Sequence, residues 1–204
     1  MNQSIEFFDK QFRHPPTDAA LKLNRFEEQA LPYLQGEVLD FGCGMGNLAF
    51  AAARRGCQVT ALDASPSAIE HIRRRASAEG VPVSAFIADL RDYRIARDYD
   101  CVVSIGLLMF FDCLTAYRVL SELQEHVRPG GYAVVNVLIE GTTYLDMFEP
   151  MNHCLFAQSE FQERFSGWAV ERSEFSDFEA PGKTMKRFST VIARKPAAGA
   201  QHGV

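Results

Sequence analysis

Apolar residues in the first two thirds of the chain gather into short, almost unbroken runs instead of alternating with polar ones. Runs of this kind, bounded by turn residues, predict strands that are buried on both faces, as in a parallel sheet covered by helices. The predicted strands are residues 36–42, 58–63, 81–89, 98–106 and 132–139.

Segments with helix signals separate these runs. Residues 17–34 are amphipathic, with Thr17 as the expected N-cap. The other predicted helices are 47–56, closed by Gly56; 66–80, with Ser65 as cap, Pro66 in the first position and Gly80 at the end; and 113–127, stopped by Pro129-Gly130-Gly131. The alternation of strand and helix predicts an open, doubly wound α/β fold with right-handed crossovers.

The pattern changes after residue 141. Residues 141–157 have no period and are long for a connection, which is typical of a lid or a binding loop. We expect a short helix at 158–165, a hairpin of 168–175 and 185–195 turning at Pro181-Gly182, and a disordered tail at 196–204. The expected organisation is a lid segment at 1–16, which includes Phe8, Phe12, Arg13 and His14, and one domain at 17–195, in which 141–165 cap the substrate.

Length and charge narrow the function classes. A chain of 204 residues with a net charge of −5 is long enough for one core and is not basic, so we expect no nucleic-acid partner. No apolar run approaches the length of a membrane span and no signal peptide is visible. The histidines have no metal-ligand spacing, so no metal site is expected.

The five cysteines are scattered, odd in number and without a C-x-x-C pair. This usage predicts reduced, packed thiols in a cytoplasmic protein instead of disulfides or ligands. The cysteines are Cys43, Cys57, Cys101, Cys113 and Cys154.

Three glycines follow the first predicted strand within five positions: Gly42, Gly44 and Gly46. A glycine-rich loop between a strand and a helix lets a ligand approach the backbone closely, and an acid about 20 residues later, here Asp63, binds a ribose. A dinucleotide and an adenosine cofactor both satisfy this pattern. Asp40, just before the loop, is a poor neighbour for a pyrophosphate and favours a cationic ligand end.

The segment from Asp40 to Gly46, "DFGCGMG", resembles motif I of class I S-adenosylmethionine-dependent methyltransferases. Asp63 is similar to the acid after their second strand, and Ala88-Asp89-Leu90 to the acidic segment beside the adenine. "YDCVVSIGLLMF" and "VRPGGYAVV" resemble the fourth strand with its loop and the turn before the fifth. The resemblance covers about residues 30 to 195 and implies a seven-stranded sheet in the order 3-2-1-4-5-7-6, with strand 7 antiparallel.

The resemblance also implies the cofactor and the residues that bind it. The cofactor is S-adenosylmethionine, and the residues are Asp40, Gly42, Gly44, Gly46, Asp63, Ala64, Asp89, Leu90, Ser104 and Ile105. Two alternatives stay open: an NAD-linked oxidoreductase, and a protein that binds S-adenosylmethionine without catalysis.

A narrower resemblance points to the bacterial tellurite-resistance methyltransferases, through "FFDKQF", "SIGLLMFFD", "RPGGY", "LFAQSEFQERFSGWAV" and "KRFSTVIARK". That family acts on small, soft nucleophiles such as tellurium and selenium oxyanions and thiols, which implies a small-molecule acceptor. Residues 175–188 contain no histidine, so of that family's histidine and arginine pair only Arg187 can be carried over. The substrate-side candidates are Phe110, His153 and Arg187, none of them a committed base. The chain is expected to be a monomer or a homodimer.

Overall fold

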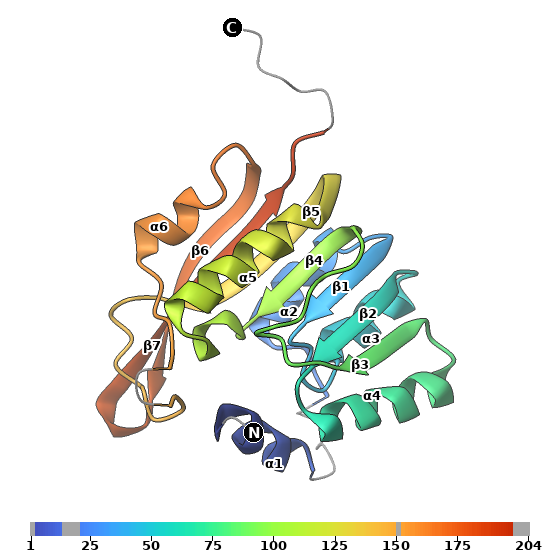
Figure 1. Ribbon diagram of the computed structural model, residues 1–204, viewed down its shortest axis with the longest axis horizontal. Helices are drawn as coiled ribbons and strands as arrows, with labels where there is room; N and C mark the ends of the chain where they lie inside the picture. The colour runs from blue at the N-terminus through green and yellow to red at the C-terminus, as the bar shows by residue number, and fades with distance from the viewer. Residues whose placement is uncertain (1–2, 14–20, 150–151, 198–204) are drawn as a thin grey trace, which may run out of the picture.

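The computed structural model describes residues 3–13, 21–149 and 152–197 and contains a single seven-stranded sheet (Figure 1). The strand order is β3-β2-β1-β4-β5-β7-β6, and β7 is antiparallel to both β5 and β6. The expected fold class and strand order are therefore confirmed. The strands are β1 Glu37–Phe41, β2 Gln58–Asp63, β3 Val83–Ile87, β4 Tyr99–Ile105, β5 Val127–Leu138, β6 Ala169–Ala180 and β7 Thr184–Arg194.

Helices cover both faces of this sheet. They are α1 Gln3–Phe12, α2 Arg25–Ala30, α3 Asn47–Arg54, α4 Pro66–Glu79, α5 Cys113–Glu125 and α6 Gln158–Glu163, with 3₁₀ turns η1 Leu31–Tyr33, η2 Leu108–Phe110 and η3 Pro181–Lys183. Figure 1 shows α5 on one face, α2 and α3 on the other, and α1 beyond the edge at which the parallel strands end. Each face has its own core, because the strands are apolar on both sides.

The helix predicted at residues 17–34 is shorter in the structure and begins later, as α2 at Arg25. Asn24, and not Thr17, caps α2: its side-chain oxygen accepts from Phe26 N at 2.9 Å and Glu27 N at 3.0 Å. The Glu27 carboxylate in turn accepts from Asn24 N at 2.7 Å, which completes a capping box. The expected cap Thr17, the lid residue His14 and the tail from residue 198 lie outside the described residues.

Two further expectations were wrong. Cys113 and Cys154 form a disulfide, while Cys43, Cys57 and Cys101 are buried free thiols. Strand β5 begins at Val127, so Pro129-Gly130-Gly131 lies inside the strand instead of before it, where the pairing with β4 shifts register. Among the described residues, no helix is long and apolar enough to cross a membrane.

Candidate functional site

A cavity of about 630 Å³ opens at the carboxyl ends of β1, β2 and β4. This edge is where the strand order reverses, between β1 and β4, and it is the usual ligand position in open α/β sheets. Its walls come from the loops after β1, β2, β3 and β4, from α1 and from the start of α2. The volume suits a drug-sized ligand.

The three glycines of the loop after β1 have different roles. A Cβ on Gly46 would lie 2.9 Å from the Ile72 side chain, and a Cβ on Gly42 2.8 Å from Leu107. A Cβ on Gly44 would meet Phe12 alone, at 3.6 Å, and would otherwise project into open space. Gly42 and Gly44 line the cavity, whereas Gly46 is buried, does not line it, and starts α3 in a left-handed conformation. Gly44 is therefore the glycine that keeps room for a ligand.

Asp63 at the end of β2 joins the glycine loop to the start of α4. Its carboxylate accepts from Gly44 N and from Ser65 N, each at 2.9 Å. Burial raises the pKa of Asp63, against the lowering effect of these backbone hydrogen bonds. The Asp63 carboxylate therefore contacts the backbone of the glycine loop and also faces the cavity.

Asp40 is buried at the end of β1, beside the cavity. Burial, with the charges of Glu27 and Asp63 nearby, raises its pKa to about 8. Sequence reasoning missed Glu27, which also lines the cavity and whose pKa burial raises. The Asn24-x-x-Glu27 spacing was the available signal, because it identifies a capping box at the start of a helix.

Asp89 and Leu90 line the cavity from the loop after β3, as Ala64 does from the loop after β2. Asp89 pairs with Arg91 at 2.7 Å, and this hydrogen-bonded partner lowers the pKa of Asp89. Ile105 also lines the cavity at the end of β4. The expected contact Ser104 does not: it is fully buried within the sheet.

Helix α1 closes the cavity from outside the sheet. Phe8 and Phe12 line it, and the carboxylate of Asp9 accepts from Ser65 Oγ at 2.7 Å and from Ser67 N at 3.1 Å. Asp9 also pairs with Arg13 at 3.0 Å. Burial raises the pKa of Asp9, but these hydrogen bonds outweigh it and lower the pKa to about 2. Asp9 therefore holds α1 onto the start of α4.

Replacing Asp9 with asparagine is expected to lower the free energy of unfolding at pH 7 by about 2 kcal/mol, since the pKa of Asp9 is about 2 instead of 3.8. The carboxylate contributes this stability above about pH 4 and loses it as the pH falls towards 2, so the gap between wild type and variant narrows there. Urea unfolding at pH 7 and at about pH 2 measures this difference in the free energy of unfolding. Glu6→Gln changes an exposed acid on the same helix and serves as the control; a gap independent of pH would contradict the role of the charge.

The three substrate-side candidates differ in their position relative to the cavity. Phe110 lines the cavity and packs its ring against Phe8 and Phe148, each with a centroid distance of 5.2 Å. His153 does not line the cavity: it stacks on Phe148 at 4.7 Å, and its Nδ1 has no hydrogen-bond partner among the described residues. Arg187 is on the hairpin, away from the cavity wall.

Arg187 has a structural partner. Its Nε donates to Asp177 at 3.1 Å, directly across the β6–β7 pair, where these two residues are in register. Glu174, a nearby acid on β6, pairs with Arg25 and Arg172. Arg187 therefore does not offer a charge to a ligand in the cavity.

Acidic groups dominate the charge of the cavity. Four carboxylates line it, on Glu27, Asp40, Asp63 and Asp89. Arg91 is the one lining cation among the described residues, and it is paired with Asp89. Such a wall repels a pyrophosphate and attracts a ligand with a positive charge. Among all the residues that the structure describes, there is no cluster of three or more His, Cys, Asp or Glu side chains that could hold a metal ion.

Comparisons with known proteins agree with this geometry. A family model described as a methyltransferase domain matches residues 38–131, which contain the glycine loop, Asp63 and Asp89. Hemagglutinin 1 of Eikenella corrodens is 24% identical over 200 residues, which are 95% of this chain and 64% of that protein. The probable S-adenosyl-L-methionine-dependent methyltransferase TehB of Haemophilus influenzae is 26% identical over 166 residues, 78% of this chain and 57% of the relative. The chain thus spans less than two thirds of the length of both curated relatives.

Solved structures share the fold. The crystal structure of TehB from Haemophilus influenzae matches with a TM-score of 0.73 at 22% identity, covering 94% of this chain and 67% of that one. The N-methyltransferase NodS from Bradyrhizobium japonicum, solved with S-adenosyl-L-homocysteine, matches with a TM-score of 0.73 at 16% identity, covering 96% and 100%. At these identities the likeness establishes the fold.

Proposed function

We propose that the chain is a class I S-adenosylmethionine-dependent methyltransferase that transfers the methyl group of S-adenosylmethionine to a small molecule. The observation that carries the proposal is the acidic cavity over the glycine loop, at the switch point of the sheet. When bound, S-adenosylmethionine supplies an activated methyl group on a positively charged sulfur.

We propose that each cofactor-binding residue contacts a different part of S-adenosylmethionine. Asp63 accepts hydrogen bonds from the ribose hydroxyls, and Asp89 with Leu90 borders the adenine. Asp40 and Glu27 face the amino-acid end, where an ammonium group offsets the cost of desolvating the buried Asp40 and the half-buried Glu27. Gly44 leaves room for the ligand against the loop. Ala64 and Ile105 contribute apolar contact.

The side chains on the acceptor side of the cavity favour a soft nucleophile as the methyl acceptor. Its wall is aromatic, formed by Phe8, Phe12 and Phe110, with no lysine, histidine or tyrosine among the described residues that line the cavity. An alcohol or amine would need a general base there, whereas a thiolate or selenolate arrives without its proton. The chain's task is then to exclude water and align the nucleophile.

Charge narrows the choice among soft acceptors. A multiply charged oxyanion needs cations, and in the described part of the cavity the one guanidinium is already paired with Asp89. Arg187 pairs with Asp177 outside it. We therefore favour organic thiols and selenols over tellurite or selenite as acceptors.

A labelled-methyl assay tests the proposal. The purified chain is incubated with S-adenosylmethionine labelled on the methyl group and a panel of organic thiols, selenols, selenite, tellurite, phenols and amines. Methylation of a thiol or selenol supports the proposal. Tight binding of S-adenosylhomocysteine with no acceptor in the panel methylated supports the non-catalytic alternative. Binding of NAD without S-adenosylhomocysteine would support the oxidoreductase.

Replacing Asp63 with alanine is expected to weaken S-adenosylhomocysteine binding by about 1–3 kcal/mol, because the ribose hydroxyls lose their acceptor. Calorimetric titration measures the affinity. Asp92→Ala, at an exposed acid that does not line the cavity, is the matched control and should leave the affinity unchanged. An unchanged affinity in the Asp63 variant would overturn the ribose assignment.

A further inference from the structure

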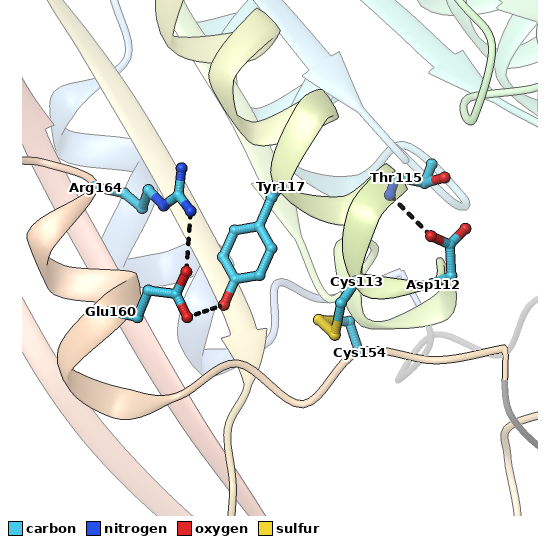
Figure 2. Close-up of a disulfide and its surroundings, with 7 residues drawn as sticks. All are labelled: Asp112, Cys113, Thr115, Tyr117, Cys154, Glu160 and Arg164. Carbon is cyan, nitrogen blue, oxygen red and sulfur yellow. Dashed lines mark hydrogen bonds and ion pairs between the residues drawn. A yellow bond between two sulfur atoms is a disulfide. The ribbon is translucent and has the colours of Figure 1, made fainter.

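The Cys113–Cys154 disulfide joins two segments that are 41 residues apart, the start of α5 and the connection after β5 (Figure 2). Cys113 is the first residue of α5, soon after the η2 turn that carries Phe110. Cys154 follows His153 directly, and its backbone N–H donates to the carbonyl of Met109 at 3.0 Å. The disulfide therefore holds the long connection after β5 against the turn that supports the cavity wall.

A row of rings runs from this disulfide to the cavity. His153 stacks on Phe148, with planes 10° apart, and Phe148 packs on Phe110. Phe110 in turn meets Phe8 of α1 edge to face. Phe110 and Phe8 line the cavity, while Phe148 and His153 stand behind them. The position of the wall thus depends on where the connection is held.

Other contacts secure the two ends of this connection without the disulfide. Before it, Thr143 N donates to Met185 O at 2.9 Å on β7. After it, Phe156 is fully buried and pairs with Ile139 as an isolated bridge.

Helices α5 and α6 also meet independently of the sulfur atoms, as Figure 2 shows. Tyr117 OH donates to Glu160 at 2.9 Å, and Arg164 pairs with the same carboxylate. Asp112 caps α5 by accepting from Thr115 N at 3.0 Å. Breaking the disulfide would therefore release the part with Phe148 and His153 and leave the fold in place.

We propose that the Cys113–Cys154 disulfide is the positioning element of the acceptor wall, so that acceptor binding, and not cofactor binding, depends on its oxidation state. The proposal rests on the proposed function, since it places the acceptor beside Phe110. Cys113 is exposed and Cys154 is fully buried, so a reductant reaches the bond from the side of Cys113. Reduction by a phosphine consumes one water: the two sulfurs take up two electrons and two protons and become thiols, and the phosphine becomes its oxide.

The test compares the wild type, before and after reduction with a phosphine, with the double variant Cys113→Ala/Cys154→Ala. Amide hydrogen exchange of residues 145–149 should be about tenfold faster in the double variant and in the reduced wild type, since local opening becomes easier. The phosphine should cause no further change in the double variant. S-adenosylhomocysteine affinity, measured by calorimetry, should stay the same in all samples.

Methyl transfer to benzenethiol supplies the second readout, at concentrations at which mass spectrometry shows the disulfide intact. KM for benzenethiol should rise about tenfold in the double variant, with a smaller change in kcat. Two variants act as controls: Cys57→Ala removes a buried free thiol of the other core, and Tyr117→Phe removes the neighbouring contact to Glu160. Neither should alter hydrogen exchange at residues 145–149.

Unchanged exchange in the double variant would overturn the proposal, as would a parallel loss of S-adenosylhomocysteine affinity. If the oxidised wild type transfers no methyl group to any acceptor, the proposed function fails, and the exchange and affinity measurements alone decide on the disulfide. The two failures are thus distinguishable.

Discussion

Replacing Asp40 with asparagine is expected to weaken S-adenosylmethionine binding at pH 9 and to flatten its pH dependence. Binding a cation favours the ionised carboxylate, whose pKa burial raises to about 8 in the free protein. Relative to the variant, wild-type affinity should therefore fall about tenfold from pH 9 to pH 7, because a proton must leave Asp40 for binding. Calorimetry across this range measures it, and the variant corrects for titration of the ligand's own amine.

The same variant is expected to be more stable than the wild type without ligand at pH 8. The folded-state pKa of Asp40 lies above its ordinary value of 3.8, so the folded protein holds the proton more tightly than the unfolded chain does. Stability from this group is present below about pH 4 and is lost as the pH rises to 8, by up to about 5 kcal/mol. The melting temperatures of the two proteins should therefore converge near pH 4.

Glu28→Gln changes an exposed acid on α2, close in sequence to Glu27, and should leave both pH profiles unaltered. Parallel profiles for wild type and Asp40→Asn would show that Asp40 does not titrate with binding. Asp40 would then be a structural acid and not an anchor for the cofactor.

Replacing Gly44 with valine is expected to abolish cofactor binding, with an affinity loss of more than a hundredfold, while the chain still folds. The new side chain would occupy the open space in front of the loop, where a Cβ meets Phe12 alone. The backbone at Gly44 has a φ of +50°, which costs a residue with a side chain about 1–2 kcal/mol. Circular dichroism and calorimetry separate folding from binding.

Gly80→Val is the matched control for that strain. Gly80 ends α4 with a φ of +64° and has nothing within 4 Å of an added Cβ, far from the cavity wall. It should lose a similar amount of stability and keep full affinity for S-adenosylhomocysteine. Unfolding of the Gly44 variant alone would show that Gly44 serves packing, as Gly46 does.

Local sequence patterns were sufficient to predict most strands and helices in the parallel part of the fold. Unbroken apolar runs identify strands buried on both faces, and Ser65, Pro66 and Gly80 bound α4 as expected. The order of the strands came from the resemblance, because no local pattern specifies which strands pair. The start of α2 was misplaced because periodicity extends beyond the helix, while Asn24 supplied the real cap.

The site was harder where it depends on distant contacts. The glycines and acids that follow a strand could be found, since their position in the loop defines their role. The disulfide could not, because Cys113 and Cys154 meet through tertiary structure across 41 residues. The partner of Arg187 could have been predicted, because a hairpin that turns at Pro181-Gly182 places Asp177 opposite Arg187.

The attachment of α1 has a kinetic consequence. Asp9 of α1 and Asp63 at the end of β2 both bind Ser65, through its hydroxyl and its backbone N–H, respectively. Phe12 lies over Gly44, so we expect a cofactor beneath α1 to leave when Asp9 releases Ser65. We therefore expect an ordered cycle in which the cofactor enters first and its spent form departs last, with the residence time set by the opening of α1.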